Sequence, residues 1–133
     1  MAQKERIFTR DFTIDAVISL CCSLNYFTLL INITGYASFA FGADPAAGGT
    51  AAGIYVIGGL LSRVLIGKYV ELVGRKKMLI AGLLLAVVMS ASYFFVTSMA
   101  MLYVVRFIHG MSYGLSSTCT SDIVAKLVPP SRR

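Results

Sequence analysis

Four long apolar runs, separated by short polar or charged segments, dominate the pattern along the chain. Each run is at least about as long as the roughly 20 residues that a helix needs to cross the hydrocarbon core of a bilayer. The pattern therefore predicts four transmembrane helices, over residues 13–39, 45–70, 78–97 and 99–122. The second run opens with Asp44 and Pro45, which is typical of an N-cap followed by proline at the first helical position.

The composition supports a membrane protein. Hydrophobic residues make up 57% of the 133 positions and charged residues only 14%, whereas a soluble domain carries about 25% charged residues. We therefore predict an all-α integral membrane fold. The three cysteines all fall inside apolar runs, so we expect buried thiols rather than disulfides.

The basic residues are distributed unevenly among the connections. They lie in the N-terminal segment (Lys4, Arg6, Arg10), between the second and third runs (Lys68, Arg75, Lys76, Lys77) and in the tail (Lys126, Arg132, Arg133). The other two connections hold none. Lys and Arg concentrate on the cytoplasmic side of membrane proteins. We therefore predict a multi-pass protein of the cell membrane with both termini cytoplasmic. The net charge of +6 does not indicate a nucleic-acid partner, because its residues lie between apolar runs.

The connection between the second and third runs reads GKYVELVGRKK, residues 67–77. A positive-inside anchor explains its charges but not their spacing. We expect Gly67 to allow close helix approach and Gly74 to permit a tight turn. Glu71 lies within reach of Arg75 and Lys76, so we expect an ion pair, or a contact with the N-terminus of a neighbouring helix.

The fourth run contains RFIHGMSYG, residues 106–114. Arg106 falls well inside the hydrocarbon region, where a charge costs about 2.5–3.5 kcal/mol on insertion scales. We therefore expect it to face a cavity or a partner. Gly110 and Gly114 share one helix face, on which a neighbouring helix can pack closely. For His109 two hypotheses stay open, a titrating histidine or one packed and hydrogen-bonded among helices.

Both stretches resemble motifs of one family, the major facilitator superfamily. Gly67-x-x-x-Glu71-x-x-Gly74-Arg75-Lys76-Lys77 is similar to the family's signature between its second and third helices. Arg106-x-x-x-Gly110-x-x-x-Gly114 is similar to the fourth-helix motif of its proton-coupled members, typically drug antiporters. The chain departs from these patterns at Glu71, usually Asp, at Leu72, often basic, and at His109, often Gln.

The resemblance implies that residues 1–133 are the first four helices of a six-helix N-terminal bundle, in a transporter of about twelve helices. It implies a gating role for the loop signature and makes Arg106, His109, Gly110 and Gly114 candidates for coupling. The first and fourth helices would line the substrate cavity. Polar residues near one face of the first run are then candidates for the substrate pathway, and hydrogen bonding between helices is the alternative: Asn25, Asn32 and Tyr36.

The leading hypothesis is a part of a secondary transporter for an unidentified small molecule, with efflux by proton antiport. No acid lies mid-run, and Asp15 lies near an end, so the proton carrier stays open. We expect the chain to be a fragment or truncated, and to need the remaining helices or other chains, in addition to membrane lipid, for transport. The alternatives are a non-transporting membrane subunit or scaffold, and a small four-helix multidrug exporter acting as a dimer.

An enzyme is not expected. The only histidine, His109, has no nucleophile or acid at a recognisable motif spacing, and no phosphate-binding loop or cluster of metal ligands occurs. We therefore expect no cofactor and no metal.

Overall fold

The structure of the protein, a computed structural model, describes residues 9–127 and is helical over nearly all of this range. The elements are α1 (Arg10–Phe41), α2 (Pro45–Val73), α3 (Arg75–Ser92), the short 3₁₀ helix η1 (Tyr93–Phe95) and α4 (Met99–Leu127). The outermost basic residues of the charge pattern lie outside the described residues: Lys4, Arg6, Arg132 and Arg133.

Local chemistry explains where the helices begin and end. The Thr9 hydroxyl accepts a hydrogen bond from the Phe12 amide and caps α1, which ends at Gly42 in the left-handed region (φ 62°). Asp44 caps α2 as expected, because its Oδ1 accepts a hydrogen bond of 2.7 Å from the Ala47 amide. Gly74 separates α2 from α3 at φ 101°, a conformation that side chains rarely adopt.

The helices extend beyond the predicted apolar runs. α1 covers residues 10–41 rather than 13–39, α2 continues to Val73, α3 begins at Arg75, and α4 continues to Leu127. The exception is the end of the third run, where α3 gives way to η1 at Tyr93. Hydropathy marks the part of a helix that suits hydrocarbon, whereas backbone hydrogen bonding continues into the charged residues that flank it.

Three of the four helical segments are long and apolar enough to cross a membrane: α1, α2 and α3 with η1 (Arg75–Phe95). Although α4 is 29 residues long, it does not belong to this group. It carries Arg106, His109 and a series of serines and threonines. Three of the four predicted transmembrane helices are therefore candidate membrane spans by length and composition, and a fourth crossing stays a prediction.

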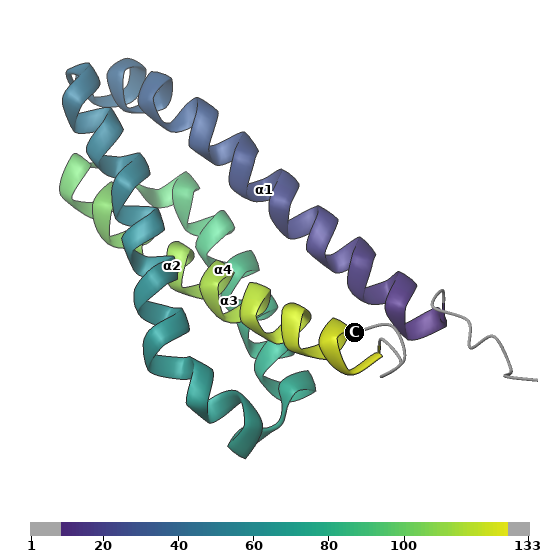
Figure 1. The fold of residues 1–133 in the computed structure, drawn as a ribbon. Coiled ribbons are helices and arrows are strands. Elements are labelled where there is room, and N and C mark those ends of the chain that lie inside the picture. The colour runs from purple at the N-terminus through teal and green to yellow at the C-terminus, as the bar shows by residue number, and fades with distance from the viewer. Residues whose placement is uncertain (1–8, 128–133) are drawn as a thin grey trace, which may run out of the picture.

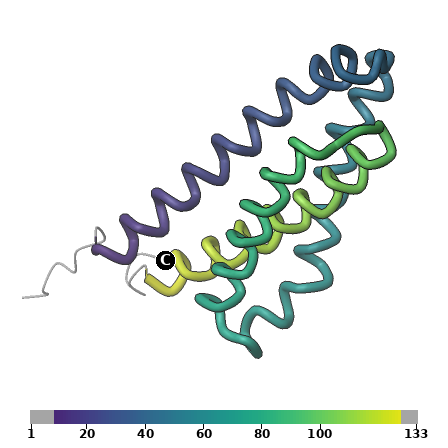
Figure 2. The backbone as a smooth tube through the Cα atoms, turned by 180° about the vertical axis from the view of Figure 1, so that it is seen from behind, coloured from purple at the N-terminus to yellow at the C-terminus, as the bar shows by residue number. Residues whose placement is uncertain are grey.

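The polar helix lies at the centre of the arrangement. α4 contacts α1, α2 and α3, and α2 is its main partner, while α1 runs along the edge (Figure 1). The start of α1, the α2–α3 turn and the end of α4 lie toward one end of the molecule, and the other two connections lie toward the opposite end (Figures 1 and 2). The described basic residues outside the helix interiors therefore gather at one end.

Two apolar clusters stabilise this packing. One includes Ile33, Ala51 and Leu102, and the other includes Val70, Leu79, Leu115 and Cys119. The prediction of buried thiols holds for Cys119 only. Cys21 is exposed and Cys22 is half-buried, because much of α1 is not covered by the other described helices.

Candidate functional site

The glycines of the fourth-helix motif lie where α4 crosses α2. A Cβ on Gly110 would lie 2.0 Å from the carbonyl oxygen of Tyr55, and one on Gly114 would lie 2.3 Å from that of Gly59. From the opposite side, a Cβ on Gly58 would lie 2.2 Å from the Phe107 carbonyl oxygen. No side chain fits between these backbones. The close approach expected at Gly110 and Gly114 is therefore present.

Arg106 is fully buried beside this crossing. Its Nε donates a hydrogen bond of 3.1 Å to the Ala51 carbonyl, and its guanidinium carbon lies 4.5 Å from the centre of the Tyr55 ring. Its Nη1 lies 3.5 Å from the Tyr93 hydroxyl, while Nη2 has no hydrogen-bond partner within residues 9–127. Arg106 thus has the expected partners, and all of them are neutral.

His109 is buried in the same cluster, one helical turn from Arg106. Its Nδ1 lies 3.4 Å from the Tyr93 hydroxyl, and its ring lies edge-on to Tyr55 at 5.4 Å. Tyr93 therefore touches both candidate residues. This environment agrees with a packed histidine held by a hydrogen bond.

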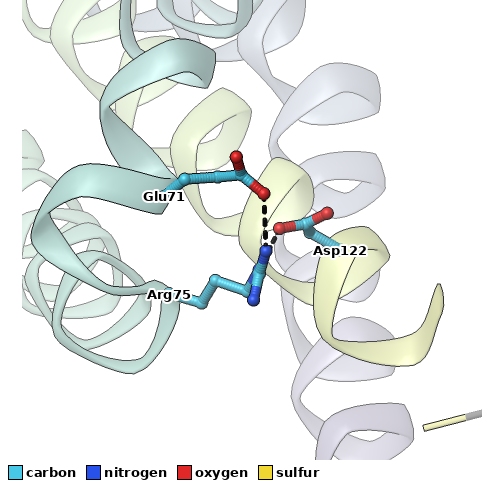
Figure 3. A network of polar contacts seen from close by, with 3 residues as sticks. All are labelled: Glu71, Arg75 and Asp122. Carbon is cyan, nitrogen blue, oxygen red and sulfur yellow. Dashed lines mark hydrogen bonds and ion pairs between the residues drawn. The ribbon is translucent and has the colours of Figure 1, made fainter. Parts of the chain in front are cut away.

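The loop signature forms an ion-paired group of three residues at the end of the molecule where α2 turns into α3. Arg75 Nη2 lies 2.8 Å from Glu71 Oε1, and Arg75 Nε pairs with the carboxylate of Asp122 on α4 (Figure 3). The expected pair between Glu71 and Arg75 is present. In the described part of the chain Lys76 and Lys77 are exposed and make no ion pair.

The two glycines of the signature differ in their surroundings. Gly74 forms the tight turn, as expected, with φ 101°. At Gly67, however, no atom of the described chain outside its own helix lies within 4 Å of an added Cβ. The close approach predicted there is absent among these helices.

Comparison with known families shows which family the chain belongs to. The family model of the Major Facilitator Superfamily matches residues 16–133. The chain belongs to the major facilitator superfamily. Its members are transporters rather than enzymes, and the chain is a multi-pass membrane protein. No curated protein and no solved structure gives a significant match.

Three residues of this superfamily member were not anticipated as part of the site: Tyr55, Tyr93 and Asp122. In the sequence pattern Asp122 marks only the end of an apolar run, yet it is the partner that joins α3 to α4. The position of Tyr55, deep inside an apolar run, was an available signal, because tyrosine in membrane helices is usually found near the interface. Nothing in the local sequence connects Tyr93 with Arg106.

Among the described residues, no hydrogen bond or ring contact joins the pathway candidates on α1 to Arg106. Asn25 lines a pocket with residues of α3 and α4. The Asn32 amide is exposed and donates to the Thr28 carbonyl of its own helix, and the Tyr36 ring packs edge-on against Phe41. Near the start of α1, Asp15 is buried and neither carboxyl oxygen has a hydrogen-bond partner among the described residues.

Proposed function

We propose that this protein is part of a secondary active transporter that carries a small molecule across the cell membrane. The observation that carries the proposal is the family match over residues 16–133, which includes both the loop signature and the Arg106 motif. In this proposal the chain provides the first four helices of a six-helix bundle, with both termini cytoplasmic. The gathering of the described flanking basic residues at one end supports this orientation.

We assign α4 as the fourth crossing although it is less apolar than the others. Five of its polar side chains are buried against other helices: Arg106, His109, Ser112, Ser116 and Thr120. Polar side chains in membranes face the interior of a bundle or a water-filled cavity. A low overall hydropathy is therefore compatible with a crossing at this central position.

The loop signature would stabilise one access state. The paired Arg75 holds the α2–α3 turn against the cytoplasmic part of α4 through Asp122. Glu71 joins the same group, yet its side chain remains 72% exposed. It is thus available to contact helices of a second bundle, as the resemblance implies. The group would separate from that bundle when the transporter opens toward the cytoplasm.

We further propose that transport is efflux by proton antiport. The resemblance of the Arg106 motif to proton-coupled members supports this direction. Asp15 is our candidate for the group that exchanges protons. An ionised carboxylate buried without a partner is so costly that such groups take up a proton instead, and Asp15 has no partner in the part of the chain described.

The four helices would act together with further helices, from the same or another polypeptide. Asn25, Thr28 and Asn32 are exposed polar residues on α1. Side chains of this kind rarely face lipid, because hydrocarbon cannot hydrogen-bond with them. Covering this face requires additional protein or a water-filled pathway. The size of the native product in membranes tests this part of the proposal.

The transport hypothesis is tested by reconstituting the native product, with any associated chains, in proteoliposomes. We would impose a pH gradient and follow the flux of fluorescent probes of positive, negative and zero charge. Gradient-driven flux of at least one probe is expected. Arg106→Lys should reduce it strongly, because a primary ammonium cannot reproduce the bond to Ala51 and the ring contact together.

Absence of flux for every probe, in protein shown to be folded, would contradict transport. It would favour a non-transporting subunit instead. Flux that is unaffected by Arg106→Lys would leave transport standing but would remove the coupling role assigned to Arg106.

A further inference from the structure

A pocket of about 240 Å³ opens between α1, α2 and α4, on the cytoplasmic side of the Arg106 cluster along α2. Its walls combine three tyrosines, two aliphatic side chains, one cation and the backbone at Gly59: Tyr26, Tyr55, Tyr113, Val56, Leu60 and Arg63. Small-molecule sites typically measure about 300–1,000 Å³. A pocket slightly below this range fits a ligand of one or two rings.

The three tyrosine rings form one aromatic cluster. Tyr26 on α1 stacks on Tyr113 on α4, with ring centres 5.1 Å apart and planes inclined by 16°. Tyr55 on α2 lies 5.4 Å from Tyr26 and 6.0 Å from Tyr113. Aromatic side chains bind flat apolar rings by stacked or edge-on contact, and tyrosine also offers a hydroxyl.

Arg63 provides the cationic wall of this pocket. Its Nη2 donates a hydrogen bond of 2.9 Å to the Ser117 hydroxyl on α4, which fixes the guanidinium toward the α2–α4 interface. Arg63 forms no ion pair with any described carboxylate. Its remaining N–H groups are therefore available to an anion, and a guanidinium can bind a carboxylate through two parallel hydrogen bonds.

Arg63 is the only charged residue among the described residues that line this pocket, and it also lines a neighbouring pocket with Glu71 and Asp122. Along the helix interiors, residues 16–43, 45–70 and 78–121, the only charged side chains are Arg63, Lys68 and Arg106. The acids all lie near helix ends, and Glu71 and Asp122 are already paired with Arg75. Because charges interact more strongly in a medium of low dielectric constant, these cations repel a cationic ligand and attract an anionic one.

We propose that this pocket binds a small planar aromatic anion, with its carboxylate on Arg63 and its ring among Tyr26, Tyr55 and Tyr113. The inference rests on the proposed transport function and names the class of its substrate. An anionic substrate differs from the cationic compounds that a multidrug exporter would carry.

The experiment compares three probes of the same ring system with the native protein in detergent: 2-naphthoate, the neutral 2-naphthamide and the cationic 2-naphthylmethylammonium. Binding is measured by isothermal titration calorimetry. We expect 2-naphthoate to bind at least about tenfold more tightly than either other probe.

Substitutions test whether Arg63 causes the preference for the anionic probe. Arg63→Gln should lower the affinity for 2-naphthoate to that for 2-naphthamide, while leaving the affinity for 2-naphthamide unchanged. Arg63→Lys should retain part of the preference, because the charge remains without the planar fork. Lys68→Gln is the matched control, since it removes the same charge from the same helix but does not line this pocket.

Equal or tighter binding of the cation, or no binding of 2-naphthoate to folded protein, would overturn the inference without relying on any variant. Loss of selectivity with Lys68→Gln as large as with Arg63→Gln would also overturn the assignment to this pocket. Selective binding without flux in proteoliposomes would confirm the site and contradict transport. Flux of a cationic probe without selectivity for 2-naphthoate would support transport and reject this ligand class.

Discussion

At the scale of single residues, neutral groups surround the buried guanidinium of Arg106. A carbonyl, a tyrosine hydroxyl and the face of an aromatic ring contact it, and no acid does so among the described residues. Each contact depends on the planar shape of the group. Such an arrangement places a guanidinium inside the helix bundle without a fixed anion among the described residues beside it.

The first residue-scale prediction concerns the glycines at the α2–α4 crossing. Gly110→Ala should destabilise the protein by about 1–3 kcal/mol, the range typical of overpacking, because the new methyl meets the backbone of Tyr55. A fall in the thermal midpoint in detergent measures this. Gly49→Ala is the matched control, since a Cβ there meets nothing within 4 Å in the described chain. Equal midpoints for the two variants would contradict the close crossing.

The second residue-scale prediction separates the two glycines of the loop signature. Gly74→Ala should cost about 1–3 kcal/mol, because its φ of 101° is strained for any residue with a side chain. Gly67→Ala should leave stability unchanged or raise it by up to about 1 kcal/mol, because alanine favours the helix and finds open space. The thermal midpoints of both variants, compared with that of the unchanged protein, test this prediction. A larger loss at Gly67 would show that another helix packs there.

At the scale of the elements, α4 organises the bundle because it carries most of the buried polar side chains. Its polar side chains require partners, and its glycines allow the neighbouring backbone to come close enough to supply them. The Ala51 carbonyl reaches Arg106 from α2, and the Tyr93 hydroxyl reaches it from η1. At the other end, Asp122 receives Arg75 from α3.

The loop ion pairs give an element-scale prediction. Asp122→Asn should lower the thermal midpoint more than Glu71→Gln. Asp122 is 37% exposed and joins α4 to a residue 47 positions away in the chain, whereas Glu71 is 72% exposed and lies only four positions from Arg75. Exposed pairs contribute little and are screened by salt. The thermal midpoints of the two variants are measured at low and at high salt. A larger fall in the midpoint for Glu71→Gln than for Asp122→Asn would contradict this ranking.

At the scale of the whole molecule, the charges and the connections are arranged by side. The α2–α3 turn, the start of α1 and the end of α4 share one end of the molecule (Figure 2). The opposite end holds Asp44 and the α3–α4 connection around Ser98, with no basic residue in either. This is the arrangement that directs insertion of membrane helices.

The prediction at this scale concerns the side of the membrane on which each connection lies. In a background with the three native cysteines replaced by alanine, a cysteine at Lys76 should react with an impermeant maleimide only after the cytoplasmic side is exposed. A cysteine at Ser98 should react from outside intact cells. Labelling of both positions from the same side would contradict a crossing between them and with it the assignment of α3 as a span.

The sequence alone indicates the helices and their approximate limits, and it predicts their orientation in the membrane. It also identified the family through residues 67–77 and 106–114. These properties follow from local physics: apolar length suits a bilayer, Asp44 caps a helix, Gly74 tolerates its φ, and Lys and Arg stay on one side. Glu71 and Arg75 could be paired from their spacing alone, because residues four apart share a helix face or meet at a tight turn.

The groups that surround the candidate site residues could be found only from the tertiary structure. The partners of Arg106, His109 and Arg75 on other helices, and the tyrosine pocket beside Arg63, are contributed by segments far apart in the chain. Such contacts depend on which faces the helices turn toward one another. Here that choice follows from the glycines at the α2–α4 crossing. The glycines can be read from the sequence, but which of them face one another is known only from the packing of α2 against α4.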